Sequence, residues 1–140
     1  MNEKNLKPAS VFYYFEEICQ VPRPSKREEK IIAYLKAFGR EHGLETKTDE
    51  VGNVLIKKPA TPGKENLKTV ILQSHIDMVC EKNSDVEHDF LIDPIDTVVD
   101  GEWLKAKGTT LGADNGIGVA TELAICLLYT SPSPRDGATS

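Results

Sequence analysis

Two amphipathic stretches near the start of the chain predict helices. In the first, Val11 to Cys19, apolar residues recur on one face at helical spacing, and Ser10 precedes them as a candidate N-cap. The second begins at Ser25, where the sequence Ser-Lys-Arg-Glu has the form of a capping box, and its apolar stripe continues towards Gly43. Because glycine adopts the left-handed conformation without steric penalty, we expect this helix to end there.

The pattern then changes to one that is typical of strands. Residues 44–58 place threonine and aliphatic residues around a Gly-Asn turn, which predicts a strand pair. The short apolar run Thr69–Leu72 is typical of a strand buried on both faces of a sheet. Another strand is expected over Gly101–Ala106, and a helix from Val119 to about Leu128. These elements predict an α/β fold in which helices pack on a mixed sheet.

Composition and charge exclude several classes of function. The 140 residues suffice for one small domain, and the net charge of −5 is spread without a basic stripe, which argues against nucleic-acid binding. No apolar run could span a membrane, and the N-terminus lacks the apolar region of a secretory signal. The sequence has three cysteines and no C-x-x-C pair. This odd number makes a disulfide framework unlikely and favours a reducing compartment. We therefore expect a cytoplasmic protein.

The first candidate for chemistry follows the run Thr69–Leu72. His75 and Asp77 are two residues apart, so on an extended strand their side chains point the same way. A neutral imidazole binds zinc well, and a carboxylate beside it can hold the ring in the required tautomer. Taken alone, the pattern more often marks a structural histidine fixed by hydrogen bonds than a metal ligand.

The second candidate is Asp114, in a glycine-rich turn that opens the last predicted helix. Glycines let the backbone bend sharply and approach an ion closely, and a carboxylate can bridge two metal ions. Alternatively, Asp114 caps the helix that follows. A phosphate-binding loop is disfavoured, because the glycines at 112, 116 and 118 do not fit the dinucleotide-binding pattern.

In combination these motifs resemble one family. The pair His75-x-Asp77, the sequence Gly101-Glu102-Trp103 and the turn from Gly108 to Gly118 are similar to the aminoacyl-histidine dipeptidases, members of the M20 group of zinc exopeptidases and deacylases. The resemblance implies a partial three-layer αβα catalytic domain over residues 1–125. Residues 126–140 match nothing in the family, and we expect them to be a non-native or disordered tail.

The resemblance also implies roles for individual residues. His75 corresponds to a ligand of one zinc ion, and Asp114 to the aspartate that bridges two. Asp77 corresponds to the catalytic-site carboxylate that orients the histidine. A cis peptide bond often follows the bridging aspartate in this family, which here is the bond between Asp114 and Asn115.

The implied activity is hydrolysis of dipeptides, Xaa-His types among them, by a water that two Zn²⁺ ions activate. The full-length protein would take a dipeptide as substrate and could form a homodimer. This chain departs from the family, which has a Glu-Glu pair with the general base after the next core strand, because no such segment is present. Glu16-Glu17 and Glu28-Glu29 lie in the early predicted helices and do not match that pair by position. The remaining zinc ligands of the family are also absent from this sequence. We therefore expect a fragment that binds metal weakly and is inactive alone.

Two alternatives remain open. One is a deacylase of N-acyl amino acids from the same group, although the long segment between His75 and Asp114 favours the dipeptidases. The other is a non-catalytic folding or binding module in which both residues are structural. The distance between their side chains separates these interpretations, because a metal site requires the two to converge.

Overall fold

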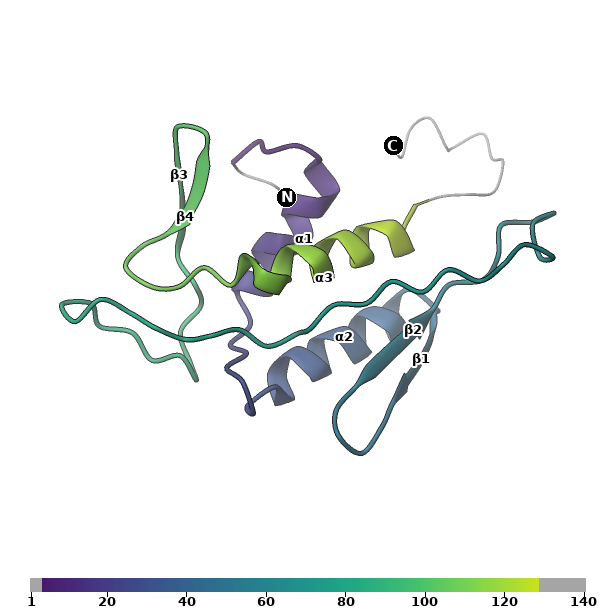
Figure 1. The fold of residues 1–140 in the computed structure, drawn as a ribbon, viewed down its shortest axis with the longest axis horizontal. Coiled ribbons are helices and arrows are strands. Elements are labelled where there is room, and N and C mark those ends of the chain that lie inside the picture. The colour runs from purple at the N-terminus through teal and green to yellow at the C-terminus, as the bar shows by residue number, and fades with distance from the viewer. Residues whose placement is uncertain (1–3, 129–140) are drawn as a thin grey trace.

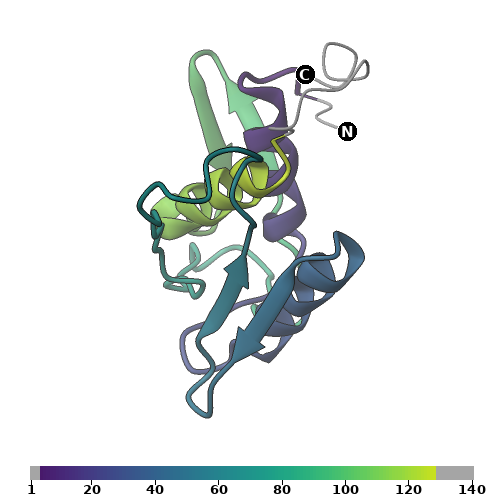
Figure 2. The same cartoon turned by 90° about the vertical axis from the view of Figure 1, so that its right-hand side faces the viewer.

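The computed structural model describes residues 4–128. Three helices and four short strands follow one another in the order α1 (Ala9–Cys19), α2 (Glu29–Glu41), β1 (Glu45–Thr48), β2 (Val54–Lys57), β3 (Thr97–Asp100), β4 (Trp103–Ala106) and α3 (Ala113–Cys126). Helices α1 and α3 pack against each other, while α2 contacts the β1–β2 hairpin (Figure 1). Figure 2 shows α1 and α3 towards one end of the molecule and α2 with its hairpin towards the other.

The first helix begins earlier than its apolar pattern predicted. α1 starts at Ala9 with Pro8 as the N-cap residue, and no side chain makes a capping hydrogen bond. Proline suits the start of a helix because its fixed φ is compatible with the first turn and its missing N–H would have no intrahelical partner. Ser10 therefore lies inside the first turn, and its predicted role as the N-cap is wrong.

The capping box predicted for the second helix is also wrong. α2 starts at Glu29 without a side-chain cap. Lys26 has a left-handed backbone, with φ of 71°, which takes Ser25 off the helical path. The Ser25 hydroxyl donates instead to Oδ2 of Asp77 at 2.5 Å. A local pattern that is typical of a helix start thus serves a contact far along the chain.

The end of α2 follows the prediction. Gly43 takes a left-handed φ of 67° just after the helix. Its N–H donates to the Arg40 carbonyl at 3.2 Å, and the Leu44 N–H donates to the Gly39 carbonyl at 2.8 Å. This pair of bonds is a Schellman motif, which satisfies the last helical carbonyls and turns the chain into β1.

The strands form two separate antiparallel pairs, β1 with β2 and β3 with β4. The first pair confirms the hairpin predicted over residues 44–58, and its turn is closed by Asp49, whose Oδ1 accepts from the N–H groups of Val51 and Asn53. The second pair includes the strand predicted over Gly101–Ala106. The α/β class is confirmed, but across residues 4–128 the strands do not join into one mixed sheet.

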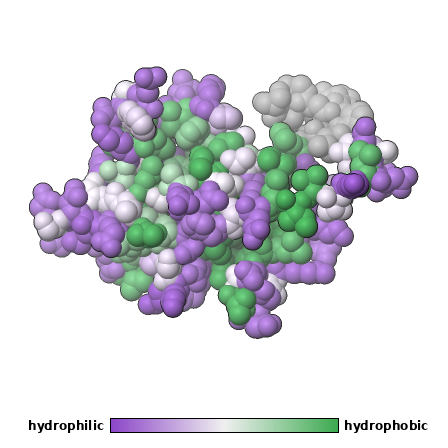
Figure 3. All heavy atoms as spheres, viewed as in Figure 1, coloured by the Kyte–Doolittle hydropathy of each residue, from purple (hydrophilic) through white to green (hydrophobic). Residues whose placement is uncertain are grey.

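The apolar run Thr69–Leu72 is not a buried strand. It joins neither sheet of the described chain, and the exposed fractions of Val70, Ile71 and Leu72 are 78%, 81% and 51%. The run belongs to a longer extended stretch, drawn in teal, that crosses the molecule in Figure 1, and Figure 3 shows apolar surface on the same face. A strand is buried on both faces only where neighbouring strands and covering layers surround it, and both hairpins lie elsewhere.

The core lies between the three helices and the segment around Met78. Its fully or nearly buried members are Phe15, Ile18, Cys19, Ile31, Leu35, Phe38, Met78, Ile95, Val119, Ala120 and Leu123. Full burial of a valine, leucine, isoleucine, phenylalanine or methionine side chain contributes about 1.5–3 kcal/mol to the free energy of folding, relative to leaving it exposed. Because Met78 directly follows His75-Ile76-Asp77, the core anchors that candidate segment against α1 and α3.

Candidate metal centre

The segment that carries His75 fixes one nitrogen of its ring. Nδ1 lies 3.0 Å from Oδ1 of Asp77 and 3.1 Å from the carbonyl oxygen of the same residue. Both oxygens only accept hydrogen bonds, so Nδ1 carries a proton and donates it. This contact sets the orientation of the ring and directs Nε2 away from Asp77.

The other ring nitrogen of His75 meets the second candidate residue. Nε2 lies 3.0 Å from Oδ1 of Asp114, which is 39 residues further along the chain. The hydrogen bond to Asp114 is the largest cause of a raised His75 pKa, and the bonds to Asp77 add to it. The structure therefore brings the predicted residues together, with the imidazole held between two carboxylates.

Asp77 is held in turn by the loop before α2. Its Oδ1 contacts His75, while its Oδ2 accepts the hydroxyl of Ser25 at 2.5 Å. The Ser25 hydrogen bond is the main reason that the pKa of the Asp77 carboxyl lies below its usual value. Ser25 thus favours the ionised form of the Asp77 carboxyl and orients it towards the histidine, a role that sequence reasoning missed.

The turn around Asp114 leaves its carboxylate free of helix capping. Asp114 and Asn115 have non-helical backbone angles, and the peptide bond between them is cis, as the family resemblance implies. Oδ1 of Asn115 accepts the Gly118 N–H at 3.2 Å, three residues on, which is the arrangement of an N-cap. Asn115 therefore caps the regular part of α3, and the alternative role of Asp114 as the cap is wrong.

Arg23 connects the two halves of this centre. Its guanidinium donates through Nη1 to the carbonyl oxygens of Ile76 at 3.1 Å and Asp77 at 3.2 Å, and through Nη2 to that of Gly112 at 2.7 Å. Burial lowers its pKa, although a guanidinium remains protonated in proteins. The sequence analysis assigned no role to Arg23; its position between Pro22 and Pro24 was the available signal.

The donor atoms present fit part of a zinc site. An imidazole nitrogen and a carboxylate oxygen are ligands that zinc binds, and here they converge. Catalytic zinc normally takes three protein ligands. Within residues 4–128, however, no group of three or more His, Cys, Asp and Glu side chains could hold a metal ion. The described residues therefore bring together two groups of the kind that zinc binds, one fewer than a catalytic zinc site normally takes.

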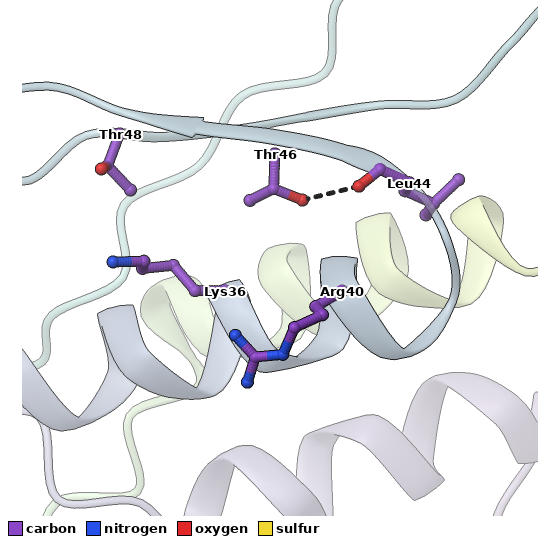
Figure 4. Close-up of a pocket in the computed structure, with 5 residues that line it drawn as sticks. All are labelled: Lys36, Arg40, Leu44, Thr46 and Thr48. Carbon is purple, nitrogen blue, oxygen red and sulfur yellow. Dashed lines mark hydrogen bonds between the residues drawn. The ribbon is translucent and has the colours of Figure 1, made fainter.

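A separate hollow lies between α2 and β1, with a volume of about 270 Å³. Figure 4 shows the residues that line it, Lys36, Arg40, Leu44, Thr46 and Thr48. The Thr46 hydroxyl there is already bonded to the Leu44 carbonyl at 3.0 Å. Because none of the candidate metal residues lines this hollow, it is distinct from the centre around His75.

In sequence and fold the chain is similar to dipeptidases, enzymes that hydrolyse the peptide bond of a dipeptide. In sequence, the chain is 52% identical over 120 residues to the cytosol non-specific dipeptidase of Escherichia coli (strain K12), across 86% of this chain and 25% of that protein. In structure, it matches the aminoacylhistidine dipeptidase of Vibrio alginolyticus with a TM-score of 0.86 and 54% identity, across 89% of this chain and 25% of that one. The family resemblance predicted from the sequence is confirmed.

A more distant match concerns the fold alone. A tripeptidase of Staphylococcus aureus superposes with a TM-score of 0.60 at 20% identity, over 84% of this chain and 31% of that one.

No family model matches the chain. Among the described residues, no helix is both long and apolar enough to cross a membrane. In length, the chain spans about a quarter of each of the two dipeptidases that it resembles.

Proposed function

We propose that this chain forms part of a zinc-dependent dipeptidase in which His75 and Asp114 bind metal and Asp77 orients His75. The observation that carries the proposal is the 3.0 Å approach of His75 Nε2 to Asp114 Oδ1. Its support includes identities of 52% and 54% to two proteins named as dipeptidases. Neither name points to the deacylase alternative, and the convergence of the two side chains disfavours a module in which both are merely structural.

Each residue of the centre has a distinct part in this proposal. Asp77 accepts the Nδ1 proton of His75, so that Nε2 is the nitrogen presented to a metal ion. Oδ1 of Asp114 faces His75, and the Asp114 carboxylate would be the group that holds both zinc ions. Bound zinc would supply Lewis-acid polarisation of the substrate carbonyl and a water of lowered pKa. Protons and zinc compete for Nε2, because that nitrogen must lose its proton to bind metal.

The chain matches about a quarter of the length of its dipeptidase relatives, and the proposal extends to the corresponding whole protein. Residues 1–125 form the N-terminal part of the catalytic domain, and the whole protein hydrolyses dipeptides with two Zn²⁺ ions per site, as a cytoplasmic enzyme and a homodimer. The word cytosol in the name of the E. coli relative supports the location. The tail predicted for residues 126–140 lies, from residue 129 onwards, outside the described residues.

Metal titration of the purified 140-residue chain tests the metal centre. We expect weak Co²⁺ and Zn²⁺ binding that His75→Ala and Asp114→Asn each reduce by at least about tenfold, since each removes a ligand. His42→Ala is the matched control, because the His42 ring packs against that of Phe38 at the end of α2, with ring centroids 4.6 Å apart, and no described contact joins it to either candidate ligand. Equal affinity in all three variants and the unmodified chain would contradict the proposed ligands.

A dipeptide-cleavage assay tests the other half of the proposal. With zinc added, the chain is expected to show no cleavage, because it supplies two metal ligands where catalysis by zinc normally uses three. The longer protein from the same gene is expected to cleave dipeptides in preference to N-acyl amino acids. The opposite preference would instead favour the deacylase.

A further inference from the structure

We infer that Arg23 is the positioning residue that sets the separation of His75 and Asp114. It does so by binding the two chain segments that carry them, without touching either side chain. The inference rests on the proposed metal centre and adds to it the residue that assembles the two ligands.

The hydrogen bonds of Arg23 reach the main chain close to both proposed ligands. The two carbonyls bound by Nη1 belong to Ile76 and Asp77, the residues directly after His75. The carbonyl bound by Nη2 belongs to Gly112, two residues before Asp114. A single planar guanidinium, whose donors have a fixed geometry, therefore links the end of the extended segment to the turn that opens α3.

The main chain at Arg23 strengthens the first of these links. Its carbonyl oxygen accepts the Met78 N–H at 3.0 Å, and the next residue, Pro24, forms a parallel bridge with Met78. The backbone of Arg23 is thus fixed to the His75 segment, while its side chain reaches the Asp114 turn. A movement of the guanidinium would move that turn relative to His75.

The burial of Arg23 indicates a role beyond filling the core. Only 2% of the residue is exposed, and its described hydrogen-bond acceptors are neutral carbonyl oxygens rather than carboxylates. Its Nε is buried without a hydrogen-bond partner among the described residues. An apolar side chain would fill the same volume without this desolvation penalty. What an apolar side chain lacks is a set of donors that can hold two segments at once.

The glycines of the turn make room for the guanidinium. A Cβ added at Gly112 or at Gly116 would lie 2.6 Å from Nη2 of Arg23, closer than any carbon and nitrogen can approach without displacement. Gly112 also has a left-handed φ of 81°, whereas Gly116 does not. An alanine at Gly116 therefore pushes on the guanidinium without imposing a disallowed backbone.

Three variants of the 140-residue chain test the inference. Arg23→Gln removes the bridge, and Gly116→Ala displaces the guanidinium while Arg23 is retained. Arg27→Gln is the matched control, since Arg27 is an exposed arginine of the same loop that pairs only with Glu29 at 3.3 Å in the described structure. Circular dichroism establishes that each variant is folded.

Two readouts separate positioning from a general contribution to folding. The first is the ¹⁵N–¹H NMR signal of the His75 ring without added metal, which reports the Nε2 hydrogen bond to Asp114. The second is Zn²⁺ affinity by calorimetry. A purely structural role would lower the melting temperature and leave the ring signal of the folded protein unchanged.

We expect Arg23→Gln and Gly116→Ala to lose the His75–Asp114 signal and to weaken Zn²⁺ binding by about 10- to 100-fold, the usual effect of removing support around a metal ligand. Arg27→Gln should change neither. A folded Arg23→Gln variant with an unchanged ring signal and affinity overturns the inference. If Arg23→Gln fails to fold, Gly116→Ala decides by the same readouts. If the unmodified chain binds no zinc, the proposed function fails, and the ring signal still decides the role of Arg23.

Discussion

At the residue scale, the centre depends on side chains that hold other side chains. Ser25 binds one oxygen of Asp77, and Asp77 binds the ring of His75 through the other. Each contact in this series removes a rotational freedom from the next residue. The orientation of Nε2 is therefore determined by residues that themselves make no contact with a metal ion in the proposed site.

Replacement of Ser25 tests this series. We expect Ser25→Ala to weaken Co²⁺ and Zn²⁺ binding by about tenfold, because the Asp77 carboxylate loses its 2.5 Å hydrogen bond and is free to rotate away from His75. Ser25→Thr, which keeps the hydroxyl, should retain most of the affinity. Ser10→Ala is a suitable control, since Ser10 is exposed and makes no capping bond in α1. Equal losses in both alanine variants would exclude a specific role for Ser25.

At the scale of elements, the contact between α2 and the β1–β2 hairpin depends on the absence of a side chain. Gly39 is buried on α2, and a Cβ built there would lie 1.8 Å from Oγ1 of Thr46 on β1. The helix and the strand can approach this closely only where one of them carries a glycine. The same residue supplies the carbonyl that completes the Schellman motif with Leu44.

Gly39→Ala is therefore expected to destabilise the fold by about 1–3 kcal/mol, the usual range for overpacking, despite the higher helix propensity of alanine. Urea unfolding followed by circular dichroism measures the change. Most of the clash involves the Thr46 side chain, so adding Thr46→Ala should recover part of the loss. A single variant as stable as the unmodified chain would show that α2 and β1 can separate freely.

At the scale of the whole molecule, the run Thr69–Leu72 is an apolar segment that the described residues leave largely exposed. Val70 and Ile71 are highly exposed, and the run has high strand propensity and no charge. Extended apolar segments with unpaired backbone groups are templates for pairing with other chains. The chain is therefore expected to self-associate through this segment at high concentration.

A charge within the run should suppress that association. We expect Ile71→Lys to lower the associated fraction in sedimentation velocity while leaving the melting temperature within about 2 °C, because Ile71 is 81% exposed and contributes little to the core. Val51→Lys introduces the same charge at the tip of the first hairpin, at a residue that is 78% exposed. If both variants reduced association equally, net charge and not the run would be responsible.

The sequence by itself determined the features that depend on near neighbours. Periodicity predicted that the three helices exist but not their first residues, so that α3, expected from Val119, begins at Ala113. Turn chemistry predicted the first hairpin, and Gly43 marked the end of α2. The pairing of His75 with Asp77 also follows from a separation of two residues. Such features were predictable because their partners lie within a few residues, where geometry hardly depends on the rest of the fold.

Only the tertiary structure decided which distant groups meet. Ser25 fits a capping box equally well, yet it bonds a carboxylate 52 residues away. Arg23 donates to the carbonyl of Gly112, 89 residues away, and no local sequence pattern predicts that hydrogen bond. The exposure of the run Thr69–Leu72 was likewise not predictable, because burial of a strand depends on whether other segments cover it. Long-range contacts depend on the path of the whole chain, and that path is a property of the packed molecule.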